Sequence, residues 1–573
     1  MVIDIEVNNK TIKANRGETI LSALKRNGIK VPTLCHIDGF VPTGACRICV
    51  VEVEGKQNLI PACSYPVEEW MKIKTHSQKV IKARKTIVEL LLANHPDDCL
   101  YCERNGNCEL QKLAEELNIR ERKYSLEREK LKIDPSCSSI IRESDKCILC
   151  GRCIRVCEEI QGVTTYDFAK INNRHIISTS FNQPLNVSNC ILCGQCIMAC
   201  PTGALHERNN IDKIQQVLNT DNKHVVVYYS PTISVSLAEE FNMKPGKNIS
   251  GIINATLRKI GFNKIFDATF ATDVYIIEQA KELISRIDNN TNLPLFTSNC
   301  PSWIKYAEEY FPEILNNISK CKSPQQIMGS IIKSLYSEQN NIPAKDIYTV
   351  SIEPCTAKKF ESQREEMTTN GISDVDIAIT TRELAQLIRL HGIDFLNIEE
   401  EFADTPYHTR SSAGKLTSVS GGTAEAILRT LNYKITGKEL EDLKISELRN
   451  NKSVKEFKIK IGKTNVGIAV ISSMSKAGDF IKTLPKRKDL HLIEIMACPY
   501  GCVNGGGQPI KADTKNIKSR IKSIYDIDSK ELIKVAHKNP QIIELYSNYL
   551  DNLTEEEKQK IIYTHYSKRD VLL

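Results

Sequence analysis

The sequence predicts an α/β domain of parallel sheet with covering helices, preceded by smaller α+β modules that hold most of the cysteines. Two observations support this prediction. From about residue 209 onward, apolar strand-like runs alternate with amphipathic helical patterns, most clearly where DVDIAIT is followed by TRELAQLIRL. Upstream of that point, cysteines recur at short, regular spacings.

Composition and charge restrict the class of protein. The 573 residues suffice for several domains and a large core, and 26% charged with 41% hydrophobic residues is ordinary for a globular chain. A net charge of +7 gives no support for nucleic-acid binding. No window has the length and hydropathy of a membrane helix, and the N-terminus does not resemble a signal peptide. We therefore expect a cytoplasmic protein, in which 21 cysteines favour metal binding over disulfides.

Residues 1–78 are expected to form a β-grasp ferredoxin-like domain. The pattern predicts a β-hairpin over 1–16 and a short helix over about 18–26, and the first cysteines follow in Gly- and Pro-containing loops. Three loop cysteines and one distant cysteine are typical of a plant-type [2Fe-2S] centre, although the first gap is longer here. A zinc knuckle is the alternative. The four candidate ligands are Cys35, Cys46, Cys49 and Cys63.

Residues 79–135 are expected to form a helical domain. An amphipathic helix over 79–93 leads into a loop with one imidazole and three thiols, namely His95, Cys99, Cys102 and Cys108. The spacing also fits a Cys3His zinc site. A position between two iron–sulfur modules favours a [4Fe-4S] cluster in an electron relay. The charge-dense stretch from about 114 to 132 is predicted to be a solvated helix that joins two modules.

Residues 136–208 contain a duplicated cysteine motif and are expected to form a bacterial-ferredoxin-like domain. Each copy reads Cys-x2-Cys-x2-Cys-x3-Cys, a spacing typical of two [4Fe-4S] clusters in which the fourth cysteine of each run binds the other cluster. We assign one cluster to Cys147, Cys150, Cys153 and Cys200. We assign the other to Cys157, Cys190, Cys193 and Cys196. Zinc or free thiols are the alternative.

Residues 209–573 are expected to form the catalytic domain. Four of its cysteines lie just past the carboxyl ends of predicted strands, where open α/β sheets build their active sites: Cys300, Cys355, Cys498 and Cys502. Glycines after Cys502 would allow the backbone to approach a bulky inorganic group. The alternative is that these are ordinary buried thiols. Cys137 and Cys321 are predicted to bind no metal.

Three segments around these cysteines resemble the active-site motifs of the [FeFe]-hydrogenases, also called iron-only hydrogenases. They read TSNCPSW, PCTAKKFE and, beginning at Met496, MACPYGCVNGGGQP. The upstream cysteine groups are similar to those of the long, single-chain clostridial form that is linked to ferredoxin. The resemblance covers essentially the whole chain.

The resemblance implies two α/β lobes with an H-cluster between them. The four cysteines would hold its [4Fe-4S] cubane, and Cys502 would also bridge to a di-iron subsite that carries CO, cyanide and an azadithiolate. Dedicated maturation proteins would install that subsite. Lys358 would hydrogen-bond one cyanide, and other residues match positions that surround the subsite: Ser230, Pro231, Gln325 and Met496.

The sequence departs from the family pattern along the proton relay. The first motif usually reads TSCCP, and its first Cys passes protons, but Asn299 stands there in this chain. The next usual Glu is replaced by Gln279, whereas Glu282, Ser319 and Arg286 match the relay. An amide does not gain and lose a proton near neutral pH. Two of the five relay positions have therefore lost their titratable group.

Two further departures make the expected pocket more polar. Glu353 replaces a usual Met, and Thr417 replaces a usual Phe. Glu353 is interpreted either as a structural carboxylate paired with a cation or as a replacement proton acceptor.

Three functional hypotheses follow. The first is a hydrogenase that interconverts H2 with protons, using electrons from ferredoxin or a similar small carrier through one [2Fe-2S] and three accessory [4Fe-4S] clusters. The second is a slow H2- or CO-sensing protein, which Asn299 and Gln279 would favour. The third is an electron carrier with an empty catalytic domain, which would leave four strand-end cysteines without a role.

Overall fold

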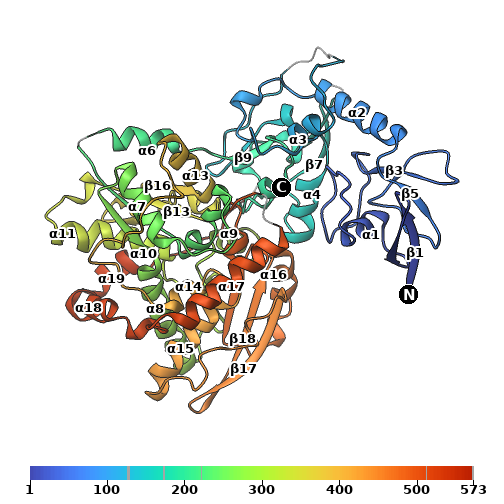
Figure 1. Cartoon of the computed structure of the whole chain (residues 1–573). Coiled ribbons are helices and arrows are strands. Elements are labelled where there is room, and N and C mark those ends of the chain that lie inside the picture. The colour runs from blue at the N-terminus through green and yellow to red at the C-terminus, as the bar shows by residue number, and fades with distance from the viewer. Residues whose placement is uncertain (125–129, 172–173, 221, 511–512, 571–573) are drawn as a thin grey trace.

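The computed structural model shows a large α/β body beside a group of smaller N-terminal modules (Figure 1). It describes residues 1–124, 130–171, 174–220, 222–510 and 513–570. Among these residues, no helix is both long and apolar enough to cross a membrane. The predicted architecture, α+β modules followed by an α/β domain, is confirmed.

The N-terminal module is a five-stranded sheet covered by one helix. Its strands are arranged in the order β2-β1-β5-β3-β4. Their bounds are Val2–Val7 (β1), Lys10–Asn15 (β2), Val50–Val53 (β3), Ile60–Pro61 (β4) and Lys72–Lys74 (β5). The predicted hairpin is present as β1 and β2. Helix α1 (Ile20–Arg26) begins at an N-cap threonine, Thr19, and packs Ile20, Leu21 and Leu24 onto the sheet.

The helical module contains α2 (Gln78–Ala93) and α3 (Glu109–Glu116). The predicted helix over 114–132 is wrong for the described residues, because α3 ends at Glu116. Asn118 adopts a left-handed conformation with φ of 51°, and the Ile119 N–H closes the turn on the Ala114 carbonyl at 2.9 Å. Residues 117–124 and 130–132 are not helical, and residues 125–129 lie outside the described residues. The alternating charges that suggested a helix here provide no apolar face to bury, and most helices in proteins depend on such packing for their stability.

The duplicated module shows its repeat in the backbone. Helices α4 (Arg152–Arg155) and α5 (Gln195–Ala199) each begin after a left-handed glycine, with φ of 71° at both Gly151 and Gly194. A five-residue π-helix, Val156–Ile160, continues α4. Two antiparallel strand pairs complete the module: β6 (Ile140–Arg142) with β9 (Leu205–Glu207), and β7 (Asp167–Ile171) with β8 (Arg174–Ser178).

The α/β body contains two four-stranded sheets. One is fully parallel in the order β11-β10-β13-β16, formed by β10 (His224–Tyr229), β11 (Lys264–Asp267), β13 (Ile347–Glu353) and β16 (Ile377–Thr380). The other has the order β12-β19-β18-β17, formed by β12 (Leu295–Phe296), β17 (Val454–Ile461), β18 (Thr464–Ser472) and β19 (Leu492–Met496). In the second sheet, β17 and β18 form an antiparallel hairpin and the remaining pairs are parallel.

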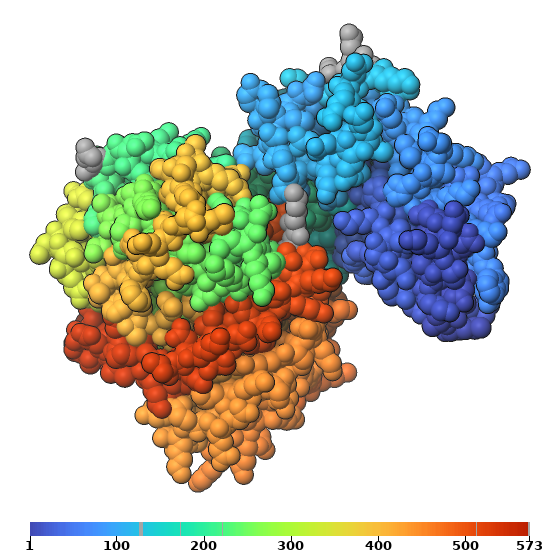
Figure 2. Space-filling view, viewed as in Figure 1, coloured from blue at the N-terminus to red at the C-terminus, as the bar shows by residue number. Residues whose placement is uncertain are grey.

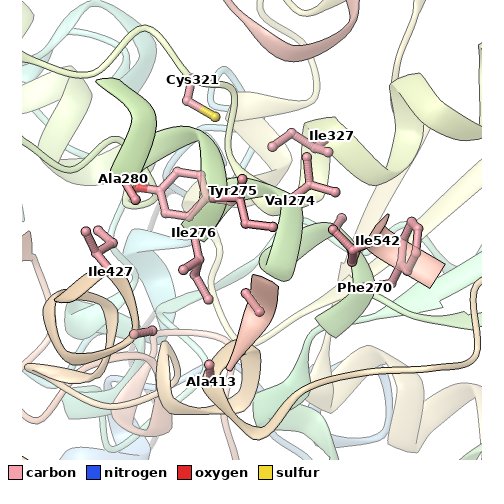
Figure 3. Close-up of a cluster of buried hydrophobic side chains, with 14 of the residues drawn as sticks. Phe270, Val274, Tyr275, Ile276, Ala280, Cys321, Ile327, Ala413, Ile427 and Ile542 are labelled. Carbon is pink, nitrogen blue, oxygen red and sulfur yellow. The ribbon is translucent and has the colours of Figure 1, made fainter. Parts of the chain in front are cut away.

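A central helix joins the two sheets. Helix α8 (Thr269–Asn289) contributes Phe270, Val274 and Tyr275 to a core that also takes residues from both sheets. Figure 3 shows these side chains beside Ile327 of α10 (Pro324–Ile331) and Ile427 of α15 (Gly422–Thr436). The two sheets therefore share one packed interior, which holds their strand ends in fixed relation.

The C-terminal helices wrap the body. In Figure 2 they form the red band across its middle. Their bounds are Thr514–Lys530 (α17), Pro540–Asn548 (α18) and Glu555–Ile562 (α19). Arg520 of α17 is fully buried and donates hydrogen bonds to Glu239 and to the Val503 carbonyl. This helix thus supports the turn that follows Cys502.

One buried ion pair ties the duplicated module to the body. Arg382 of α13 (Thr381–Leu390) donates to both carboxylate oxygens of Glu207, at 2.7 and 2.9 Å, and to the Gly506 and Gln508 carbonyls. Burial alone would raise the pKa of the Glu207 carboxyl, but Arg382 outweighs it and lowers that pKa to about 2.

We expect Arg382→Ala to destabilise the protein by about 3–5 kcal/mol, because it leaves Glu207 buried without its partner. The matched control is Arg389→Ala on the same helix, whose half-exposed pair with Glu240 should contribute no more than about 1 kcal/mol. Urea denaturation measures both. Because the pKa of Glu207 in the folded protein lies below its unfolded value of 4.5, the ion pair stabilises the fold above that pH. The stability difference between wild type and Arg382→Ala should therefore shrink as the pH falls from 4.5 towards 2. Equal losses in the two variants would contradict this role.

Candidate functional site

One pocket lies where the two sheets meet. It is lined by all four strand-end cysteines of the body. Cys300 precedes α9 (Pro301–Tyr310) and follows β12, Cys355 follows β13, and Cys498 and Cys502 follow β19. The thiols thus come from both sheets, at the carboxyl ends of their strands, where such folds place active sites.

Cys498 is buried and Cys300, Cys355 and Cys502 are half-buried, and this environment disfavours free thiolates. Burial raises the pKa of each of the four thiols, to about 12 for Cys355, and neighbouring thiols raise it further for Cys355, Cys498 and Cys502. Among the described residues, no three Cys, His, Asp or Glu side chains converge closely enough to hold a single metal ion. Four thiols spread around one pocket fit a bulky iron–sulfur group, because coordination to iron stabilises the thiolate form.

Glycines allow the loop after Cys502 to pass close to its neighbours. A Cβ at Gly505 would lie 2.2 Å from the Pro354 carbonyl oxygen, and one at Gly506 would lie 2.2 Å from the Cys193 carbonyl oxygen. No side chain fits at either position. The loop is therefore held directly against the loops that carry Cys355 and Cys193.

Polar groups also face the pocket. The residues expected to surround the subsite all line it: Ser230, Pro231, Gln325, Met496 and Lys358. Within the described part of the chain, three buried oxygens of the lining have no hydrogen-bond partner: Gln325 Oε1, Ser302 Oγ and Thr423 Oγ1. Such orphaned polar atoms fit a pocket that holds a polar group.

Lys358 is fixed by a buried ion pair. Its ammonium donates to the Ser323 hydroxyl at 2.8 Å and to Glu361 Oε2 at 2.7 Å. Burial lowers the pKa of Lys358, but Glu361 and Glu353 outweigh it, so the net shift is upward and the side chain stays charged. A cation is thereby held at the edge of the pocket.

Asn299, Glu353 and Thr417 line the same pocket and make it polar. Glu353 is 5% exposed and accepts a hydrogen bond from the Ser351 hydroxyl at 3.0 Å. Burial raises the pKa of Glu353 to about 7, against a smaller opposing effect of Lys358. The carboxylate that pairs with Lys358 within ion-pair distance is that of Glu361, whereas Glu353 accepts its hydrogen bond from Ser351.

Four of the five predicted relay residues form one hydrogen-bonded chain behind the pocket. Gln279 donates from Nε2 to the Ser319 hydroxyl at 2.5 Å, and Ser319 donates to Glu282 Oε2 at 2.5 Å. Arg286 binds the other Glu282 oxygen at 2.6 Å. The structure thus brings Gln279, Ser319, Glu282 and Arg286 together. Gln279 is fully buried, and its amide also donates to the hydroxyl of Ser298 at 3.4 Å. Ser298 directly precedes Asn299, so the hydrogen-bonded chain approaches Asn299 at Gln279.

The N-terminal thiols lie as two touching pairs. The Cys46 thiol hydrogen-bonds Cys35 and lowers its pKa to about 5, and the Cys49 thiol does the same for Cys63, lowering its pKa to about 7. The pKa values of Cys46 and Cys49 rise correspondingly. Each pair therefore brings two thiols together in the loops that would hold the [2Fe-2S] centre.

The duplicated module gathers its eight cysteines into two sets. A second cavity is lined by one set: Cys147, Cys150, Cys153 and Cys200. In the other set, burial raises the pKa of Cys193 well above its usual value, with Cys196, Cys190 and Cys157 as charged neighbours that raise it further. Both groupings place the fourth cysteine of one run beside the other run.

The helical module places His95 just after α2, buried at 6% exposure, and Cys99, Cys102 and Cys108 in the loop before α3. Cys99 is exposed; partial burial raises its pKa, and the nearby Cys102 adds to that rise. Leu100 and Tyr101, beside Cys99, are exposed as well. This cysteine group therefore reaches the surface of the molecule.

Sequence reasoning missed three side chains that cross from one cysteine loop to the next. Arg104, between Cys102 and Cys108, donates to the Cys200 carbonyl at 3.1 Å. Arg155, between Cys153 and Cys157, donates to the Cys35 carbonyl at 2.5 Å. Gln195 donates to the Cys498 sulfur. Their only sequence signal is a polar residue inside a cysteine motif, which does not identify the partner loop.

Comparison with known proteins agrees along the whole chain. Five family descriptions match: "2Fe-2S iron-sulfur cluster binding domain" at 1–78, "NADH-ubiquinone oxidoreductase-G iron-sulfur binding region" at 84–123, "4Fe-4S dicluster domain" at 146–204, "Iron only hydrogenase large subunit, C-terminal domain" at 223–506 and "Iron hydrogenase small subunit" at 514–569.

Relatives span the same length. "NADP-reducing hydrogenase subunit HndD" from Solidesulfovibrio fructosivorans is 39% identical over 100% of both chains, and "Iron hydrogenase 1" from Clostridium pasteurianum is 37% identical over 98% of this chain and 100% of its own. A solved structure of a variant of the [FeFe]-hydrogenase HydA1 from Chlamydomonas reinhardtii is 31% identical with a TM-score of 0.56, covering 62% of this chain and 99% of that one.

We expect Lys358→Met to destabilise the body by about 3–5 kcal/mol, because Glu361 would remain buried without its cation. The double variant Lys358→Met, Glu361→Gln should recover most of that loss, since the unpaired charge is then gone. Urea denaturation of the three proteins measures the effect. A double variant no more stable than the single one would show that the ion pair is not what Lys358 contributes to the fold.

Proposed function

The chain belongs to the iron-only hydrogenases, and we propose that it interconverts H2 with protons and electrons at an H-cluster held by Cys300, Cys355, Cys498 and Cys502. The observation that carries this is the meeting of four thiols from two sheets in one pocket. When bound, the H-cluster supplies the redox-active iron and the dithiolate amine at which the H–H bond forms or breaks. Di-iron maturation proteins would load it.

The chain's own residues shape that pocket. Lys358, held by Glu361 and Ser323, presents a cation to the anionic ligands of the cluster. Ser230, Pro231, Gln325 and Met496 line the wall around the subsite. Because these groups are buried, their interactions act in a low dielectric and water is kept out.

We propose that electrons travel through one [2Fe-2S] and three accessory [4Fe-4S] clusters in four domains. Their bounds would be 1–78, 79–135, 136–208 and 209–573. The first two domains carry the cysteine groups farthest along the chain from the pocket, so a small carrier such as ferredoxin would dock there, in the cytoplasm. The printed name of the NADP-reducing relative raises a nicotinamide-linked partner as the second candidate. H2 evolution with reduced ferredoxin, compared with NADPH, distinguishes the two.

The proton side carries the main departure from the family. Asn299 at the pocket and Gln279 in the relay chain each offer an amide where a proton must be gained and lost. Glu282 and Ser319 remain as an intact outer segment, which runs to Arg286. We therefore propose slow proton delivery rather than loss of the cluster. The sensing alternative is not favoured, because the full-length relatives are hydrogenases.

We expect loaded protein to contain about 20 iron atoms per chain, the content of one [2Fe-2S], three [4Fe-4S] and a six-iron H-cluster. His95→Ala should lower this by about four or change the spectrum of one accessory cluster, with the CO and cyanide infrared bands retained. Iron analysis, electron paramagnetic resonance and infrared spectroscopy measure the outcome. The matched control is Cys137→Ser, which should lose no iron. An unchanged His95→Ala protein would remove His95 from the ligand set.

We expect Asn299→Cys to raise H2 turnover about tenfold or more, because a thiol donates and accepts a proton where an amide does not. Adding Gln279→Glu should raise the rate further than either single change, since two breaks in series are non-additive. H2 evolution from a low-potential donor measures the rates at equal cluster content. If Glu353 already provides a working path, wild type is fast and Glu353→Met stops turnover instead. A slow wild type that no restoration improves would contradict the proton-path account.

A further inference from the structure

We propose that Gln195 is a positioning residue that links the nearest accessory cluster to the catalytic cubane and raises the reduction potential of that cubane. The inference rests on the proposed function, because it takes Cys193, Cys196 and Cys498 to be cluster ligands. No motif of the sequence singles out this glutamine.

The geometry of Gln195 spans the two sites. Gln195 lies between Cys193 and Cys196 at the start of α5, and it is 8% exposed. Its Nε2 donates to the Cys498 sulfur at 3.2 Å and to the Asn504 carbonyl at 2.8 Å. One amide therefore connects the ligand loop of one cluster with a thiol of the next and with the turn that carries Cys502.

The surrounding backbone leaves this amide little freedom. A Cβ at Gly194 would lie 2.5 Å from Thr356 Oγ1, and Thr356 itself donates to the Leu192 carbonyl at 2.8 Å. On the other side, Gly506 packs against the Cys193 carbonyl. The three ligand loops are in direct backbone contact at this junction, so Gln195 is held at a fixed distance from Cys498.

The hydrogen bond has an electrostatic consequence for the cubane. Reduction adds negative charge to the cluster and its thiolates, and a donor to a ligand sulfur stabilises that charge. The effect is larger in a buried site than in water. Removing the donor should therefore make the cubane harder to reduce. The same bond provides a short path of bonded atoms between the two ligand loops.

The chain offers a matched control at the same junction. Gln161 is 1% exposed and also crosses from the duplicated module to the body. Its Nε2 donates at 3.0 Å to the carbonyl of Ala497, the residue before Cys498. Gln161 thus makes a comparable buried contact to the same segment but does not touch a sulfur. Substitution of either glutamine weakens the contact between the duplicated module and the body, whereas only substitution of Gln195 removes a hydrogen bond to a thiolate.

The test is a redox titration of loaded wild-type protein, Gln195→Leu, Gln195→Glu and Gln161→Leu, followed by electron paramagnetic resonance and by the CO and cyanide infrared bands. We expect Gln195→Leu to lower the reduced-to-oxidised ratio of the cubane about tenfold at a fixed potential, or about 59 mV for one electron. Gln195→Glu should lower it at least as much, because a carboxylate of similar volume repels the thiolate. Gln161→Leu should change the ratio by less than about twofold.

Each other outcome overturns the inference. If the reduction potential of the cubane is unchanged in both Gln195 variants, the hydrogen bond to the thiolate does not determine that potential. If the potential shifts equally in Gln195→Leu and Gln161→Leu, the effect comes from the contact between the module and the body. If Gln195→Leu does not assemble its clusters, the Gln195→Glu titration decides between these results. A wild type without CO and cyanide bands would instead overturn the proposed function, and this inference with it.

Discussion

The convergence of four thiols in one pocket is the constraint on which this structure depends. Desolvation raises their pKa values, so the pocket is stable as a set of thiolates only when the charge is taken up by metal. Bringing these thiols together requires strand ends from two sheets, a shared core built around α8, and glycines that let three cysteine-bearing loops touch. The buried ion pairs at Lys358 and Arg382 hold the loops in that arrangement.

We propose that electron and proton movements are served by different parts of the fold. On the electron side, a side chain from inside one cysteine motif reaches the next motif at three junctions, through Arg104, Arg155 and Gln195. On the proton side, the hydrogen-bonded chain is continuous from Gln279 to Arg286, but its innermost member, Gln279, is an amide. In the proposed function, the electron path therefore has a contact at each of these junctions, whereas the proton route has altered chemistry at its inner end.

Cysteine spacing made the accessory cysteine groups predictable, because an iron–sulfur cluster needs several thiols within one short loop. Such a loop is visible in the sequence as closely spaced cysteines. The alternation of strands and helices likewise predicted β13, β16 and β19 and the strand ends that carry the pocket. The helix predicted over 114–132 was wrong, since mixed charge did not outweigh the left-handed turn at Asn118. Gln195 and Arg155 could not be predicted, because their partners lie far away in sequence and depend on how the modules dock.

The central claim is that this pocket holds an H-cluster that turns over H2. The most direct measurement is infrared spectroscopy in the CO and cyanide stretching region on protein matured with the di-iron subsite, together with H2 evolution from a low-potential donor on the same sample. The account predicts sharp CO and cyanide bands and measurable, slow H2 evolution. Protein that accepts the maturation machinery, contains its accessory iron and yet shows neither bands nor H2 would contradict it.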